Sequence, residues 1–223
     1  MPRRKLNLLV AGLLLLAGCS EPVSHAFTTQ STNTEAPAPT TTAPLEAAQA
    51  PTRPDEPIVI TGAGFDLHTA GRVGTAAFDA AWAGVLQTLN RYLEAAVLTP
   101  LRTGGPADDL TPMFTPLSVA QVMNVGTNRA AFIDEGLAPA TDLRKDAGVA
   151  RLTALAGADG TMSVVTAILD LKLSGLVGGA PLSLERAGEL VLVPEGGTWR
   201  IDAWDLKVTR RLAQTTTTTA VRS

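Results

Sequence analysis

The chain has 223 residues, of which 45% are hydrophobic and 17% are charged, and its formal net charge is −3. This length suits one ordinary domain with appendages. One cysteine and two histidines exclude an intrachain disulfide and a metal site built from clustered cysteines or histidines.

The first nineteen residues have the order of an export signal. A basic start at residues 3–5 precedes an apolar stretch at 8–16, which is shorter than the roughly 20 residues that a membrane-spanning helix needs. The stretch ends in Leu16-Ala17-Gly18-Cys19. This order resembles the bacterial lipoprotein signal. The resemblance implies that Cys19 carries a lipid, that residues 1–18 are removed, and that the protein is anchored at the outer face of the cytoplasmic membrane.

Two alternatives concern this signal. It could be a plain secretory signal with a chance cysteine, and Arg3-Arg4 is also compatible with twin-arginine export, although the flanking residues favour the general route. Removing residues 1–18 takes away three basic residues and no acidic one. Because the mature chain is then more acidic, we expect no nucleic-acid partner, and we expect membrane attachment through the lipid alone.

Low-complexity segments flank the predicted domain. Residues 19–57 are rich in Thr, Pro and Ala and show no helix or strand period, so we predict a disordered tether after the lipidated cysteine. Residues 213–223 contain five consecutive threonines, and we predict a second disordered tail there. A single domain is expected between them, at residues 58–212.

The domain opens with a short apolar run and Gly62-Ala63-Gly64. Gly-x-Gly after a strand is typical of dinucleotide-binding turns, but Leu67 stands at the position of the third glycine and no parallel βαβ units follow. We therefore expect no nucleotide cofactor and interpret this segment as a glycine-rich loop. His68 is predicted to be a surface histidine in that loop.

One strongly amphipathic helix is predicted over 75–98, with an apolar stripe that includes Phe78, Trp82 and Leu89. Thr75 is suited to capping its start, and Pro100 with the following glycines is expected to end it. Shorter helices are predicted over 118–124 and 128–135.

From Gly148 onward the sequence predicts four strands joined by short glycine turns. They cover residues 148–156, 161–177, 182–193 and 198–210. Strands joined only by tight turns must be antiparallel, so we predict a four-stranded meander. A one-residue slip in the apolar alternation predicts a β-bulge near Asp202–Trp204. The expected core comprises Phe78, Trp82, Val85, Leu89, Leu93, Leu169, Leu171, Leu190, Leu192 and Ile201.

The fold class expected from this order is α+β: a long N-terminal helix and short helices packed on a curved antiparallel sheet, as a cone-shaped roll. This order resembles the nuclear-transport-factor-like, or ketosteroid-isomerase-like, superfold. The resemblance lies in the helix at 75–98, the segment 110–135 and the final strand Thr-Trp-Arg-Ile-Asp-Ala-Trp at 198–204. The resemblance covers about 150 residues. Because the superfold includes enzymes as well as non-catalytic domains, the resemblance does not select a function.

Six polar side chains are candidates for acid–base chemistry in a conical pocket. They are Tyr92, Asp134, Glu135, Asp170, Arg186 and Asp202. Enzymes of the resembling superfold use Tyr and Asp in this way, and Arg186 shares its phase with apolar residues of its strand. A solvent-exposed sheet or helix face accounts for most of the others, so we assign no catalytic, cofactor-binding or metal-binding residue.

The leading hypothesis is a lipid-anchored envelope protein whose non-catalytic domain binds a small apolar molecule or an envelope protein. The alternatives are an extracytoplasmic isomerase or dehydratase that uses Tyr92 and a carboxylate, and a lipid-carrier lipoprotein. A homodimer is also predicted, because Val164, Ile168, Val191 and Val193 occupy the strand face opposite the core.

Overall fold

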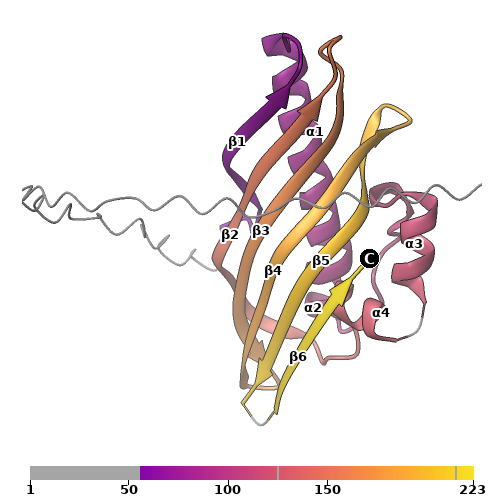
Figure 1. Ribbon diagram of the computed structural model, residues 1–223. Helices are drawn as coiled ribbons and strands as arrows, with labels where there is room; N and C mark the ends of the chain where they lie inside the picture. Colours follow the sequence, from indigo (N-terminus) through magenta and orange to yellow (C-terminus); the bar gives the residue numbers. More distant parts are fainter. Residues whose placement is uncertain (1–55, 125, 214) are drawn as a thin grey trace, which may run out of the picture. The chain divides into compact units, whose positions relative to one another are not determined.

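A six-stranded, mostly antiparallel sheet with helices against one of its faces forms an α+β fold (Figure 1). The computed structural model describes residues 56–124, 126–213 and 215–223. The strands follow one another across the sheet in chain order. The four predicted strands are present as a central antiparallel meander. Strand β3 (Met162–Val177) is one residue shorter than expected, and the other three are longer: β2 (Ala140–Ala156), β4 (Ala180–Glu195) and β5 (Thr198–Leu212).

The prediction of only four strands is wrong, because a further strand pairs at each edge of the meander. Strand β1 (Thr61–Thr69) runs parallel to β2, and β6 (Thr215–Arg222) is antiparallel to β5. The segment expected to be a glycine-rich loop therefore lies in the sheet, where Phe65 and Leu67 pack against the core. The predicted C-terminal tail is also a strand, because threonine has high β-propensity and β5 offers it an unpaired edge.

The helix predicted over 75–98 begins at the expected residue but is not N-terminal, since β1 precedes it. It consists of α1 (Thr75–Tyr92) and a π-helical turn, η1 (Leu93–Leu98), and continues into α2 (Thr99–Thr103). Pro100 does not end the helical run as expected. It lies in the first turn of α2, where its missing amide hydrogen is tolerated, and Gly104 ends the run with a φ of +69°.

Three short helical segments connect this run to β2. They are η2 (Thr111–Met113), α3 (Pro116–Met123) and α4 (Thr127–Phe132). The last two correspond to the two short helices expected from the sequence. Helix α3 lies beside β5, and α4 lies beside β5 and β6 (Figure 1).

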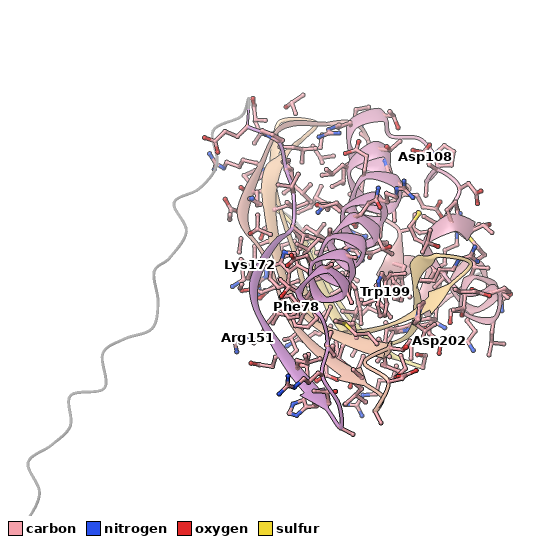
Figure 2. The ribbon with its side chains drawn as sticks, turned by 90° about the horizontal axis from the view of Figure 1, so that it is seen from above. Phe78, Asp108, Arg151, Lys172, Trp199 and Asp202 are labelled. Atoms are coloured by element: carbon pink, nitrogen blue, oxygen red, sulfur yellow. The ribbon has the colours of Figure 1, made fainter. Side chains whose placement is uncertain are left out.

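The core lies between α1 and the concave side of the sheet, which curves around the helix when seen from above (Figure 2). All ten predicted core residues belong to it, and eight are buried. Phe78 and Trp82 are only partly buried, because they pack near the β1 edge, where Phe65 contacts both rings.

Gly62 has a packing function in β1. A Cβ atom on Gly62 would lie 2.0 Å from Cζ2 of Trp82, so the missing side chain makes room for the indole. A shift in register between Gly62 and Gly64 follows at the same point. Helix–strand packing thus explains the first glycine of the Gly-x-Gly sequence.

Candidate functional site

Tyr92 is fully buried and its hydroxyl is engaged by core groups. Its hydroxyl donates a hydrogen bond to the carbonyl oxygen of Phe132 at 3.2 Å and accepts one from Nη1 of Arg186 at 3.0 Å. Its ring meets those of Phe114 and Phe132 edge to face. No carboxylate within the described residues hydrogen-bonds to this hydroxyl.

Asp134 joins two arginines from neighbouring strands. Nη2 of Arg186 on β4 donates to one carboxylate oxygen, and Nε of Arg210 on β5 donates to the other at 3.0 Å. Asp134 and Arg186 are fully buried, and the side chain of Arg210 is 19% exposed. The backbone nitrogen of Asp134 also donates to the carbonyl oxygen of Ala96 in η1 at 3.0 Å. One residue therefore connects the end of α4, the helical run and two strands.

This cluster is suited to holding elements together. Burial raises the pKa of Tyr92 to about 12, so the hydroxyl stays protonated at neutral pH. Burial is the largest influence on the pKa of Arg186 and lowers it, but attraction to Asp134 and Tyr92 and the hydrogen bonds with both together raise that pKa above its ordinary value. A second guanidinium on the same carboxylate leaves the cluster with excess positive charge. Sequence phase correctly placed Arg186 inward, and the structure adds Arg210, whose neighbour Arg211 is exposed.

The other predicted carboxylates are separate from this cluster. Glu135 forms a two-point ion pair with Arg129, at 2.6 and 2.8 Å, and these hydrogen bonds lower the pKa of Glu135. Asp170 lies on the outer sheet face with its Oδ1 3.7 Å from Nζ of Lys172. These residues and Tyr92 do not converge on one cavity.

Asp202 lies at the β-bulge that the sequence predicted. Ile201 and Ala203 pair with consecutive residues of β4, which leaves Asp202 as the extra residue. Its Oδ1 accepts a hydrogen bond from the Thr115 hydroxyl at 2.8 Å, and its carbonyl oxygen accepts one from Ser118. The bulge therefore directs Asp202 toward the start of α3, which it anchors to the sheet.

His68 is exposed, as predicted, but it lies in β1 opposite Leu155 of β2 and not in a loop. Cys19, the predicted lipidation site, lies outside the described residues, as do the signal and most of the tether.

An open cleft runs along one side of α1. Its volume is about 460 Å³. The helix contributes one stripe of small residues followed by polar ones: Ala77, Ala80, Ala81, Gly84, Gln87, Thr88 and Arg91. At 1.5 Å per residue, this stripe is about 21 Å long. The opposite wall comes from the β2–β3 turn at 159–162, the start of β5 at 197–199, and Pro112.

Trp199 is the large aromatic side chain of the cleft, and Figure 2 shows it beside α1. The indole packs on Gly84, where an added Cβ would lie 2.7 Å from Cδ1 of the tryptophan. The Thr88 hydroxyl donates to the carbonyl oxygen of Trp199 at 2.7 Å, which fixes the strand to the helix. Gly84 thus accommodates the indole, and the small side chains of Ala77 and Ala80 leave the cleft open beside it.

Two charged side chains line the cleft. Arg91 is exposed on the helix and makes no ion pair with any described residue. Asp159 lies in the β2–β3 turn and accepts hydrogen bonds from the backbone nitrogen and hydroxyl of Thr161, which lower its pKa. Arg91 is therefore the charge that is available to a ligand.

The sequence analysis missed this cleft. Its signal was present as small residues at helical spacing, Ala77, Ala80 and Gly84, on the face opposite the apolar stripe. Small residues on a helix indicate a cleft only when the opposite wall, here Trp199, is known.

Three results bear on function class. Within the described residues, no group of three or more His, Cys, Asp or Glu side chains is arranged to hold a metal ion. In the same part of the chain, no helix combines the length and the apolar character needed to cross a membrane. Comparison of the chain with protein-family models, curated proteins and solved structures finds no match.

Proposed function

We propose that this protein is a lipid-anchored binding module of the bacterial envelope, and that the cleft beside α1 is its binding site. In this proposal Cys19 carries the lipid, residues 20–57 form the tether, and the domain presents the cleft to a ligand near the outer face of the cytoplasmic membrane. Kinship with the nuclear-transport-factor-like superfold remains part of this proposal, on the sequence resemblance alone.

The observation that carries the binding proposal is the combination of small helix residues, a fixed Trp199 and an unpaired Arg91 in one open cleft. A length of about 21 Å accommodates about six residues of an extended peptide at roughly 3.4 Å each. Small side chains at Ala77 and Ala80 allow a backbone to approach the helix closely, beside the indole that covers Gly84. The ligand we propose is an extended segment of an envelope protein, with an apolar side against Trp199 and an acidic group near Arg91.

The two alternatives fit less well with the interior. A lipid carrier needs an apolar cavity, whereas Leu169, Leu190 and Leu192 are packed in the core with at most 1% of their surface exposed. An enzyme based on Tyr92 needs a carboxylate partner at the substrate, whereas the hydroxyl is held by Arg186 and a backbone carbonyl. These contacts support a binding role.

Photocrosslinking in the native cells tests the cleft. A benzophenone amino acid at Ala80 is expected to capture one peptide segment that mass spectrometry identifies reproducibly. The same probe at Asp79, which is exposed and outside the cleft, is the matched control. Arg91→Glu should reduce the yield at Ala80, because it reverses the charge offered to the acidic group.

Equal capture at both positions would contradict the binding site, and capture of a lipid or another small molecule would replace the peptide in the proposal. The anchor is tested separately: Cys19→Ser should abolish incorporation of radiolabelled fatty acid and leave residues 1–18 uncleaved, because cleavage before Cys19 follows lipidation. Retention of the label in that variant would contradict lipidation at Cys19.

A further inference from the structure

The outer face of the sheet, which points away from α1, carries an apolar patch on three neighbouring strands. Its members come from β2, β3 and β4; we call them the outer patch: Leu155, Val164, Ile168, Val191 and Val193. Leu155 and Ile168 are 52% and 45% exposed, and the three valines are partly exposed. Side chains of this size on a solvent-facing sheet indicate an interaction surface.

The outer patch is bordered by two opposite charges that flank Ile168 on its middle strand. Arg151 on β2 and Glu189 on β4 are the direct cross-strand neighbours of Ile168 on β3. Two strand spacings of about 4.8 Å separate the charges, and the isoleucine stands between them. Neither forms an ion pair with any described residue. Figure 2 shows Arg151 pointing away from α1.

A two-fold rotation matches these features to themselves. Consider two copies packed face to face, with the two-fold axis between them and parallel to β3. The rotation places β2 of one copy opposite β4 of the other, and each residue keeps its level along the strands. Arg151 of one protomer then faces Glu189 of the other, twice, around a contact between the two Ile168 side chains. Leu155 faces Val193 in the same way. Such self-complementarity is the requirement for an isologous dimer of packed sheets.

The same axis agrees with the proposed anchor. Rotation about the strand direction leaves Glu56, where the described domain begins, at the same end of the sheet in both copies. Both tethers can therefore reach one membrane. An axis in the same plane but perpendicular to the strands would place the two tethers at opposite ends of the dimer. Centred on Thr166, it would bring Arg151 of one copy toward Leu155 of the other, so the opposite charges would not meet.

We propose that the outer patch binds a second copy of this chain, with Ile168 at the two-fold axis and two Arg151–Glu189 ion pairs beside it. This interface is separate from the cleft, so either proposal can fail without the other. Confinement of both copies to one membrane raises their effective concentration and favours even a weak dimer.

Sedimentation equilibrium of the mature chain carrying Cys19→Ser tests the interface, over protein concentrations from about 1 to 500 μM. We expect a monomer–dimer equilibrium. Ile168→Lys should abolish the dimer, because it replaces the apolar contact at the axis by two like charges. The next outward residues of β3 along the axis are Asp170 and Lys172, whose Oδ1 and Nζ atoms are 3.7 Å apart, so their charges offset each other within each copy. Arg151→Glu and Glu189→Arg should each raise the dissociation constant about tenfold, and combining them should restore affinity to within about threefold.

Arg211→Glu is the matched control, since Arg211 is exposed on the same sheet face but lies outside the outer patch. It should leave the dimer unchanged. Restoration by the combined charge swap also distinguishes a specific contact from misfolding, which a second substitution would not repair.

A thiol placed at the axis gives an independent measurement. Because Cys19 is the only cysteine, Ile168→Cys in the Cys19→Ser chain carries one thiol. A short bifunctional thiol reagent should link two such chains and should leave Arg211→Cys unlinked. A monomer at the highest concentration, a dimer insensitive to Ile168→Lys, or loss of the dimer when residues 19–55 are deleted would overturn the proposal. The last result would mean that the tether, and not the outer patch, holds the copies together.

Discussion

Replacing Asp134 by Asn tests whether the buried cluster stabilises the fold. The substitution preserves size but leaves Arg186, which is fully buried, facing a neutral amide, and it deprives Arg210 of the same partner. Breaking a buried ion pair by removing one member reduces the free energy of unfolding by about 3–5 kcal/mol. For a domain of this size each kcal/mol shifts the melting temperature by about 2–4 °C, so we expect a decrease of about 6–20 °C.

The neighbouring Glu135→Gln is the matched control. Its ion pair with Arg129 has side chains that are 32% and 24% exposed, so solvent screening limits the loss to less than about 1 kcal/mol. Urea unfolding of both variants, followed by tryptophan fluorescence, gives the comparison. Equal stabilities for Asp134→Asn and Glu135→Gln would refute the assigned role of Asp134. Asp134→Leu combined with Arg186→Met should recover much of the loss, because it removes both buried charges.

Gly62→Ala should lower the free energy of unfolding by about 1–3 kcal/mol in the same urea assay, because the new Cβ overlaps Trp82. Gly64→Ala is the control: the nearest atom to its new Cβ is 4.0 Å away, so it should be neutral or slightly stabilising. The chain has a single tyrosine, so absorbance at 295 nm reports Tyr92 alone. In the folded protein we expect ionisation near pH 12, and in urea near pH 10. Because the folded-state pKa is raised, stability should be fully present below about pH 10 and should fall as pH rises toward 12; ionisation of the folded protein near pH 10 would contradict burial of the hydroxyl.

The sequence predicted the central meander, the start of the long helix and the bulge at Asp202, because these depend on local periodicity. It did not predict β1 or β6. Strand β1 pairs with residues that lie about ninety positions away, and β6 is a threonine run whose composition alone resembles a disordered tail. Strand β1 formed because the meander offered an unpaired edge to a distant segment, which is information that no local window contains. Strand β6 pairs with β5, its neighbour in the sequence, so its signal was local but was hidden by its composition.

The candidate site was predicted to a smaller extent. The phase of Arg186 correctly indicated an inward charge, but the identity of its partner depends on how the end of α4 meets β4. The residues predicted for acid–base chemistry do not share one site. Tyr92, Asp134 and Arg186 form the buried cluster, whereas Glu135 forms an ion pair and Asp202 a contact at the bulge. The cleft arises from the approach of Trp199 to Gly84, two residues 115 positions apart in the sequence.

The last strand, β6, covers the edge of the sheet at β5. Ser223 hydrogen-bonds to both the backbone nitrogen and the carbonyl oxygen of Trp204, and the final strand completes the edge of β5. Because β6 covers this edge, removing residues 215–223 would leave backbone donors and acceptors of β5 unpaired, and an unpaired edge strand is a template for association with another chain. The same arrangement implies that an affinity tag is better placed after the tether than at the end of β6.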